Sequence, residues 1–538
     1  MACTLSRYGL FRSPGTQPEE FMEAWEKYHY DFRLLVLNEL SEPTSLHAHG
    51  LNPPNGQDGV AYITEPPIPP GEEREYRFRA QVGGGSFWLH AHSSLHAGLG
   101  LWIPLVLQHP SQERQNLGNP SELILMAEDQ FVHPYCAYSP FLYPEKCQHL
   151  VTTEHARVAY YLNRKTSPQV VPCSAGEKFV LRLRNAGTEA TWHFNLSWFS
   201  SAMLLALDGN DVQRGHMVDT KEHAIILSSA QRTDVLVQVP GSGCYPIIVS
   251  SGSHAGDEQH PVSRVLFLDA SKVPEPCVPP EFPRFMPAYS HFSRLTPARY
   301  PMKKRKVMRN LSWEISAGEQ FGFAGNCYAQ EQVHLCREYK WPLPPTRSWQ
   351  QNETGYMVHS RRPCQGCELL ERFNATGIIH GRCWEWSDMD AKNCSRFRPV
   401  PLEYAIPIRQ QSLQSKPLMV CRGDRVQLTV SNVPRFGDGE GHPIHLHGHI
   451  MELRKVENFT GGRWVLEWQG DASGPHDTVW VERNHRVTME FDANNPGRWL
   501  LHCHNEFHLF NGMSTRVVYH PDSSPECPHL SPQWAGET

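Results

Sequence analysis

The chain has 538 residues, 20% of them charged, and a formal net charge of −6. This mild acidic balance excludes a strongly basic surface, so we expect no nucleic acid partner and no anionic membrane partner. The length allows about three or four domains. The 44 prolines, 39 glycines and 15 tryptophans favour a turn-rich β protein, and no apolar run is long enough to predict a membrane span.

Cysteines and glycosylation sequons favour an oxidising compartment. The chain has 15 cysteines, and if Cys503 binds a metal, an even number is left that could pair as disulfides. Six Asn-x-Ser/Thr sequons occur, at Asn195, Asn310, Asn352, Asn374, Asn393 and Asn458. Together these features predict a secreted or lumenal protein, although residues 1–15 show no apolar stretch and therefore no visible signal peptide.

The first part of the chain carries two pairs of histidines on predicted strands. Residues 1–30 show no strand period, so we expect irregular structure before about Asp31, and strand-like sequence begins at residues 32–37. Two histidines separated by a single residue then occur twice: His47 and His49, followed by His90 and His92. In a strand, residues at i and i+2 point to the same face, so each pair can present two ligands to one metal site.

The middle of the chain lacks such pairs. Residues 121–270 alternate short apolar segments with turns, which predicts a second β domain that acts as a spacer without metal. Residues 274–301 are rich in proline and predict a linker. Six cysteines lie in residues 327–394. Cys364-x-x-Cys367 could indicate zinc binding or redox chemistry, but no second such pair follows, so we favour a disulfide-stapled insertion of open connectivity.

The last part of the chain repeats the histidine pattern and adds a cysteine. His445 and His447 again stand one residue apart, and His502 and His504 flank Cys503. In an extended segment Cys503 points away from both flanking histidines, so one metal on each side of the strand is possible. Cysteine, two histidines and a distant methionine form the ligand set of a blue-copper site. Cys503, His508 and Met513 fit this set, with His442 as the second histidine, whereas a structural zinc site is the simpler alternative.

These four histidine segments together resemble the multicopper oxidase family, which includes laccases, ferroxidases and ascorbate oxidase. The resemblance spans roughly residues 32–520 and implies an all-β fold of three cupredoxin-like domains, each a Greek-key β-sandwich or barrel. The first expected domain, residues 1–118, holds half of a trinuclear copper site. The second, residues 119–272, holds no metal and is followed by a linker, residues 273–306. The third, residues 307–538, holds the type 1 copper and the other half of the trinuclear site. The first domain looks short at its N-terminus, and the third carries the Cys-rich insertion.

The resemblance also implies a ligand set for four copper ions. Type 1 copper would take His442, Cys503 and His508, with Met513 as the axial ligand. Type 2 copper would take His47 and His445. The two type 3 ions would share six histidines: His49, His90, His92, His447, His502 and His504. Asp58 and Glu506 match the family's proton-relay acids. His96 and His449 match no ligand position, so we expect them behind the ligands or at the surface. Ala48 departs from the family, which usually has an aromatic residue or histidine there.

The implied reaction is oxidation of a reductant at type 1 copper, coupled to reduction of dioxygen to water at the trinuclear site. We expect a laccase-like monomer that oxidises a small phenol-type donor. The alternative is a metal-ion oxidase such as a ferroxidase. Yeast-type ferroxidases place a carboxylate two residues before the Asp-Gly of the second domain, and this chain has Ala206 there, before Asp208-Gly209. A copper-free structural protein is a third alternative, disfavoured because all eleven His and Cys ligand positions are present.

Overall fold

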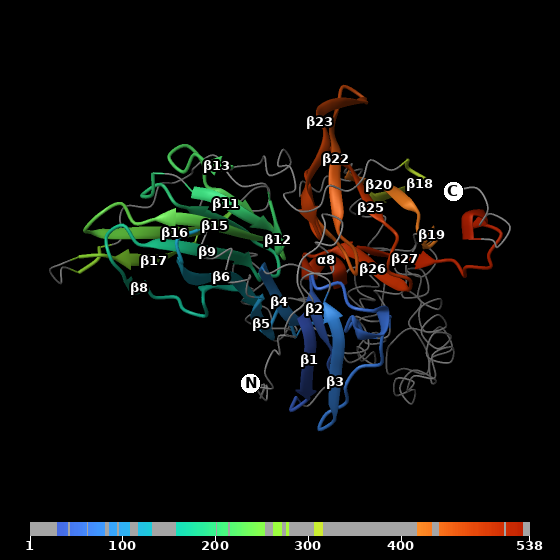
Figure 1. The fold of residues 1–538 in the computed structure, drawn as a ribbon, viewed down its shortest axis with the longest axis horizontal. Helices are drawn as coiled ribbons and strands as arrows, with labels where there is room; N and C mark the ends of the chain where they lie inside the picture. The colour runs from blue at the N-terminus through green and yellow to red at the C-terminus, as the bar shows by residue number, and fades with distance from the viewer. Residues whose placement is uncertain are drawn as a thin grey trace, which may run out of the picture.

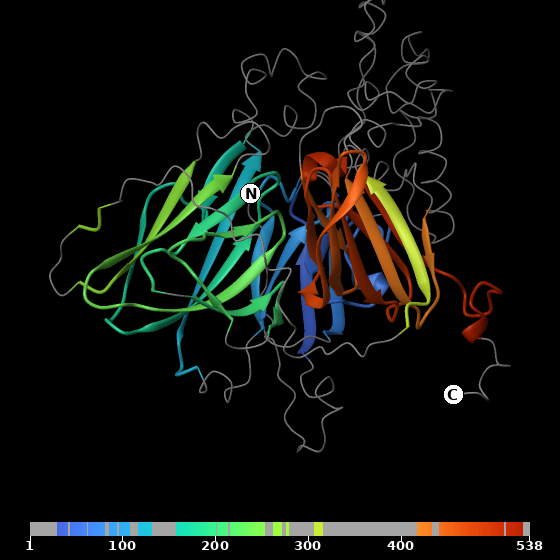
Figure 2. The ribbon, with the colours of Figure 1, turned by 90° about the horizontal axis from the view of Figure 1, so that it is seen from above.

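The computed structural model describes residues 30–40, 43–61, 63–80, 85–93, 96–107, 117–131, 158–200, 202–212, 216–252, 262–271, 276–278, 306–315, 417–432, 441–510 and 513–530. These residues form six β-sheets, and within them the only α-helix is the short α8 (Glu506–Phe510). Each sheet draws its strands from one of three consecutive parts of the chain, here called the first, second and third units. The second unit lies on one side of the molecule, and the first and third units pack together beside it (Figures 1 and 2). The all-β prediction is confirmed.

The first unit contains a two-stranded and a three-stranded sheet. The antiparallel pair is β1 (Tyr30–Leu37) with β3 (Glu73–Ala80), and the other sheet has the order β2 (Leu46–His49), β4 (Gly85–Ala91) and β5 (Trp102–Leu107). In β3, buried Tyr76 and Phe78 alternate with outward arginines, which is the pattern of a half-buried strand. Phe78 stacks on Phe32 across the pair, with ring centroids 4.7 Å apart. The predicted irregular structure before Asp31 lies outside the described residues, except that β1 includes Tyr30.

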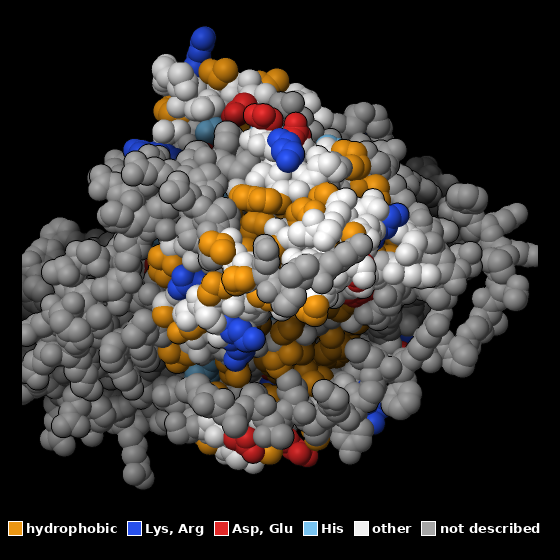
Figure 3. Space-filling model, turned by 90° about the vertical axis from the view of Figure 1, so that its left-hand side faces the viewer, with side chains coloured by type: hydrophobic (Ala, Val, Ile, Leu, Met, Phe, Trp, Pro, Cys, Tyr) orange, Lys and Arg blue, Asp and Glu red, His pale blue; other side chains and the backbone are white. Residues whose placement is uncertain are grey.

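The second unit contains two larger sheets around one core. The first has the order β14 (Ile225–Leu227), β10 (Thr191–Asn195), β16 (Cys244–Gly252), β17 (Ser263–Asp269) and β8 (Gln169–Pro172). The second has the order β12 (Asn210–Asp211), β11 (Ala202–Leu207), β15 (Arg232–Gln238), β9 (Lys178–Asn185), β6 (Ser121–Phe131) and β7 (Val158–Leu162), with β13 (Met217–Val218) beside β11. Buried Trp192, Phe194 and Phe199 fill the core. Figure 3 views this side of the molecule, on which charged side chains are scattered rather than gathered in one patch.

The third unit contains two five-stranded sheets. One has the order β18 (Arg309–Ile315), β20 (Arg425–Asn432), β25 (His485–Asp492), β22 (Met451–Thr460) and β23 (Arg463–His476). The other has the order β19 (Leu418–Val420), β27 (Ser514–Tyr519), β26 (Arg498–Cys503), β21 (His442–Leu446) and β24 (Thr478–Val481). The domain boundaries given above stay predictions, as do the linker and the Cys-rich insertion, which lie almost wholly outside the described residues.

Two disulfides occur in the described part of the chain, Cys244–Cys277 and Cys421–Cys527. Cys173 is a free, half-buried thiol, so not all of the cysteines other than Cys503 are paired. Burial, with nearby acidic groups, raises the pKa of the Cys173 thiol to about 11. Among the described helices, none is both long enough and apolar enough to cross a membrane.

Candidate metal centre

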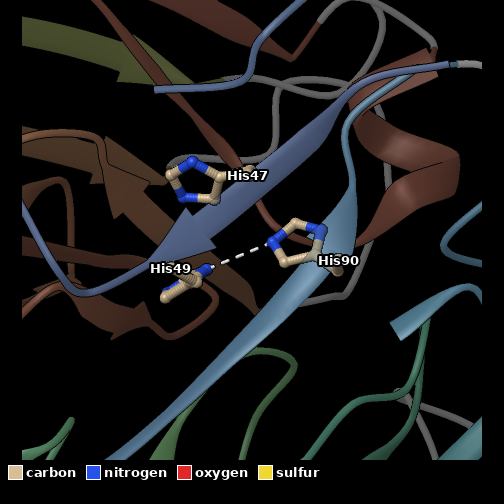
Figure 4. A group of neighbouring side chains, drawn as sticks. All are labelled: His47, His49 and His90. Atoms are coloured by element: carbon tan, nitrogen blue, oxygen red, sulfur yellow. Dashed lines mark hydrogen bonds between the residues drawn. The ribbon is translucent and has the colours of Figure 1, made fainter. Parts of the chain in front are cut away.

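Two strand pairs in different units carry the histidines in the same register. In the first unit β2 pairs antiparallel with β4, so that His47 stands opposite His90. In the third unit β21 pairs antiparallel with β26, so that His445 stands opposite His502. Directly opposed residues of an antiparallel pair share a face of the sheet, so both pairs present their rings to one side. Figure 4 shows His47 and His49 on one strand and His90 on its neighbour.

The histidine faces of the first and third units meet. The rings of His49 and His445 stack across the junction, with centroids 3.9 Å apart, and those of His47 and His447 lie 4.2 Å apart. All eight histidines predicted for the trinuclear site gather here, none more than 5% exposed: His47, His49, His90, His92, His445, His447, His502 and His504. The structure thus brings together residues that lie more than 400 positions apart in the chain. We call these eight residues the histidine cluster.

Backbone oxygens fix two rings of the cluster through hydrogen bonds from their Nδ1 atoms. His47 donates from Nδ1 to the Asp58 backbone oxygen at 2.6 Å, and His445 donates from Nδ1 to the Asp477 backbone oxygen at 2.7 Å. Within the described residues, the Nε2 atoms of both rings have no hydrogen-bond partner, although they are buried. A buried, unpartnered nitrogen is costly unless it binds something. His47 and His445 are the two residues predicted to hold type 2 copper.

Other rings of the cluster point nitrogens at one another. His447 has Nδ1 2.9 Å from Asp58 Oδ2, and His502 has Nδ1 2.9 Å from the Cys503 backbone oxygen. These acceptors require the proton of each neutral ring to be on Nδ1. The two Nε2 atoms, 3.1 Å apart, then face each other with lone pairs. His49 Nδ1 and His90 Nε2 form a similar pair at 3.4 Å. A cation between facing lone pairs removes their repulsion, so the donor set fits metal ions.

The electrostatics of the cluster keep seven of its eight imidazoles neutral. Burial is the largest cause that lowers the pKa of His445 and His447 well below the usual value, and neighbouring histidines lower it further. Burial likewise lowers the pKa of His502 to about 3. The same direction holds for four more rings: His49, His90, His92 and His504. Neutral imidazole is the form that binds copper, zinc, iron and nickel.

On the other face of β26, Cys503 forms a second candidate site. Its Sγ lies 3.5 Å from His508 Nδ1 and 3.8 Å from His442 Nδ1, and these two nitrogens are 3.1 Å apart. All three side chains are buried, and the Cys503 thiol is free. Met513 is fully buried in the same hydrophobic core as Cys503, and its backbone oxygen accepts a hydrogen bond from the Cys503 N–H. The axial role of Met513 stays a prediction.

Asp58 lies against the histidine cluster from the first unit. It follows the short 3-10 helix η1 (Asn55–Gln57) and is completely buried. Its side chain contacts His447 and its backbone oxygen contacts His47, so it links ligands predicted for two different kinds of copper. The turn depends on Gly59, whose φ is +81° and where a Cβ would lie 2.0 Å from the Leu46 backbone oxygen.

Glu506 begins α8, next to the cluster but with different neighbours. Its Oε2 accepts a hydrogen bond from the Gly98 N–H at 3.1 Å, and its own N–H donates to the Thr188 backbone oxygen at 2.9 Å. Burial raises the pKa of Glu506 to about 8, and the negative charges of Asp129 and Glu189 act in the same direction. The carboxyl group is thus able to hold a proton near neutral pH.

The two extra histidines are both buried, which excludes a surface position. His449 is 2% exposed, donates from Nδ1 to the His447 backbone oxygen at 2.9 Å, and accepts at Nε2 from the Tyr519 hydroxyl at 2.7 Å. His96 is 4% exposed and contacts the Thr44 hydroxyl at 3.0 Å. His449 therefore stands behind a cluster residue, as one of the two alternatives predicted.

Three polar residues around the cluster were missed from the sequence. Asp477 contacts both His49 and His445, and Arg232 contacts Asp477. Ser229 lies 3.2 Å from His504 Nδ1 through its hydroxyl. Arg232 and Ser229 belong to the second unit, which therefore contributes to the surroundings of the cluster although it carries no cluster histidine. The prediction of a metal-free spacer did not foresee these contacts, because isolated polar residues leave no spacing pattern.

Comparison with known proteins places this geometry in a family. Models of multicopper oxidase domains match residues 25–112 and 389–523. The chain is 23% identical to multicopper oxidase MmcO of Mycobacterium tuberculosis, covering 90% of this chain and 78% of that protein. It is 25% identical to Laccase-20 of Oryza sativa subsp. indica (91% and 85% covered) and 24% identical to iron transport multicopper oxidase fetC of Epichloe festucae (89% and 68% covered).

Solved structures show the same fold. Fet3p, a multicopper oxidase that functions in iron import, aligns with a TM-score of 0.60 at 15% identity, covering 91% of this chain and 83% of that one. The laccase from Botrytis aclada aligns with a TM-score of 0.55 at 17% identity, covering 91% and 80%. The fold and the site together define a protein of cupredoxin-like domains with two histidine-rich candidate metal sites. Residues 25–112 and 389–523 match multicopper oxidase domains, and the relatives named here are multicopper oxidases and laccases, which are copper-dependent oxidoreductases that use dioxygen. The predictions of family and fold are confirmed.

Proposed function

We propose that this protein couples one-electron oxidation of a small phenol-type donor to the four-electron reduction of dioxygen to water. The histidine cluster carries this proposal. Its buried rings turn nitrogens toward one another or toward no partner, and β26 links it directly to the Cys503 site. Two metal centres on opposite faces of one strand are what a donor-to-oxygen relay requires.

The ligand assignments are those that the family resemblance implies, and the inward-facing ring nitrogens support them. Cys503, His442 and His508, with Met513 axial, would hold type 1 copper. His47 and His445 would hold type 2 copper through their unpartnered Nε2 atoms. The remaining six cluster histidines would hold the type 3 pair. When bound, copper supplies the one-electron redox steps and the store of four electrons that this reaction needs.

The chain itself provides the connection between the two centres. His502, Cys503 and His504 are consecutive, so only backbone and side-chain bonds separate the Cys503 thiolate from two rings of the cluster. Burial of all three residues keeps water out of this connection. The core around Cys503, with Ile444 and Leu446 on the neighbouring strand, keeps the site dry and its side chains fixed.

Protons for water formation come from acids at the cluster. Glu506 holds a proton on its carboxyl group near neutral pH and begins the helix that follows His504. Asp58 accepts at Oδ2 from His447 and so fixes that ring. We assign Glu506 the role of proton donor and Asp58 the role of orienting acid and second relay group.

The proposal also distinguishes between two classes of electron donor, phenols and ferrous iron. The relatives include laccases as well as an iron transport oxidase, so both donor classes are represented among them. Ala206, which stands where yeast-type ferroxidases have a carboxylate, is buried and apolar, and this favours an organic donor over ferrous iron. The test is oxygen uptake by the copper-loaded protein with a phenol and with ferrous iron. A ratio of kcat/KM values that favours the phenol supports the proposal, and one that favours iron replaces it with a metal-ion oxidase.

The cellular compartment of the protein is also part of the proposal. The two disulfides of the described residues, one in the second unit and one in the third, favour a secreted or lumenal location because such bonds persist in oxidising compartments. We further propose that the protein acts as a monomer.

A further inference from the structure

A buried arginine of the second unit reaches the histidine cluster. Arg232 begins β15 and is 1% exposed. Its guanidinium makes bidentate hydrogen bonds to Asp477 of the third unit: Nη1 donates to Oδ1 at 2.8 Å, and Nη2 donates to Oδ2 at 2.7 Å. Nη1 also donates to the Ala230 backbone oxygen, and Nε donates to the Ser86 backbone oxygen in the first unit. This single side chain thus contacts all three units.

Asp477 in turn accepts hydrogen bonds from two cluster histidines. Its Oδ1 accepts from His49 Nε2 at 3.1 Å, and its backbone oxygen accepts from His445 Nδ1 at 2.7 Å. Asp208, also of the second unit, completes the arrangement: its Oδ1 accepts from the Arg232 N–H at 3.0 Å and its Oδ2 from the Asp477 N–H at 3.3 Å.

The carboxylate decides which nitrogen of His49 faces inward. With the proton on Nε2, directed at Asp477, the lone pair of Nδ1 points at His90 Nε2, 3.4 Å away. A carboxylate or carbonyl behind a metal-binding histidine fixes the ring's tautomer and orientation in this way. A buried carboxylate holds such a position only if its own charge is compensated, and the guanidinium compensates it with fixed geometry.

The neighbouring glycine confirms how tightly the parts fit. Gly50 follows His49 and has a φ of +87°. A Cβ at this position would lie 2.6 Å from Arg232 Nη2 and 2.9 Å from Asp477 Oδ2. The first unit therefore leaves no room for the ion pair to shift toward it.

We propose that Arg232 is a positioning residue for the trinuclear copper site: through Asp477, it fixes the rings of His49 and His445 from outside the two units that carry the ligands. This inference rests on the proposed function of the cluster as a copper site. It assigns the second unit a part in assembling that site. Among the described residues, Arg232 hydrogen-bonds no predicted ligand itself and reaches the cluster through Asp477.

The test compares Arg232→Lys with Arg425→Lys in the copper-loaded full-length protein. Lysine keeps the positive charge but lacks the planar pair of parallel N–H donors that matches the two carboxylate oxygens. Arg425 is a matched control, since it is 1% exposed and paired with Glu452 and Glu490 on a sheet that carries no predicted ligand. After exposure to a copper chelator, the readouts are remaining copper, the type 2 copper electron paramagnetic resonance spectrum and the blue absorption of the Cys503 site.

Arg232→Lys should lose cluster copper about 10–100-fold more readily than wild type, the range typical for loss of a group behind a metal ligand. Its type 2 spectrum should change, its blue absorption should persist, and Arg425→Lys should match wild type. The double variant Arg232→Met/Asp477→Leu removes both buried charges and should show the same copper loss. If Arg232→Lys retains copper and spectrum like the control, or loses the blue absorption in parallel with cluster copper, the inference is wrong. A wild-type protein without cluster copper would instead contradict the proposed function.

Discussion

The carboxyl group of Glu506 gives the most specific mechanistic prediction. Glu506→Gln keeps the size of the side chain and an oxygen that can accept from the Gly98 N–H, but it cannot deliver a proton. With a pKa of about 8, about nine tenths of the Glu506 carboxyl groups carry a proton at pH 7 and about one tenth at pH 9. The positive charge of nearby copper would lower the pKa, so the carboxyl group is half protonated at or below pH 8.

We expect the Gln variant to bind copper normally and to accept electrons from the donor at the wild-type rate. Reoxidation of the fully reduced protein by dioxygen should slow by about 10²–10⁴-fold, the usual contribution of general acid catalysis. In the wild type, reoxidation should slow as the pH rises through the pKa of Glu506, and the variant should lose this pH dependence. Stopped-flow reoxidation across pH 5–10 measures both effects. Equal rates in the variant and the wild type would refute the assignment and make Asp58 the leading donor.

Three further perturbations test separate parts of the account. Cys503→Ser should abolish the blue absorption while the cluster still binds copper, and a persistent blue band in the absorption spectrum would exclude the thiolate as ligand. Gly50→Ala forces a left-handed backbone on alanine, costing about 1 kcal/mol or more, and displaces the Arg232 ion pair. Its melting temperature should therefore fall by about 1 °C or more, and an unchanged value would contradict the close fit. Expression in a secreting eukaryotic host should place glycan on exposed Asn310 but not on buried Asn195, and peptide mass spectrometry that finds the reverse would contradict the structure.

The gathering of the eight histidines could be predicted from the sequence because they follow a local rule. His-x-His places two rings on one face of a strand, so the pattern is visible within three residues and repeats in two units. The structure shows the same cross-strand register in both units, His47 opposite His90 and His445 opposite His502. The Cys503 site was predictable for a similar reason, because three of its four proposed ligands lie within residues 503–513.

The surroundings of the cluster could not be predicted in this way. Arg232 and Asp477 are 245 residues apart, and their contact exists only once the second and third units have packed. The sole hint in the sequence is a charged residue at the start of a predicted strand, in Arg232-Thr-Asp-Val-Leu-Val. Such a charge is usually found at the surface, and only its burial in the structure shows that it serves another purpose. The same holds for Ser229, a single hydroxyl without a pattern.

The copper content of the purified, copper-loaded chain tests the central claim most directly. Metal analysis should find about four copper ions per chain in the wild type and about one fewer in Cys503→Ser, because the blue site and the histidine cluster bind copper separately. A chain that binds no copper, or only the copper of the Cys503 site, would contradict the account of the histidine cluster as the site of dioxygen reduction.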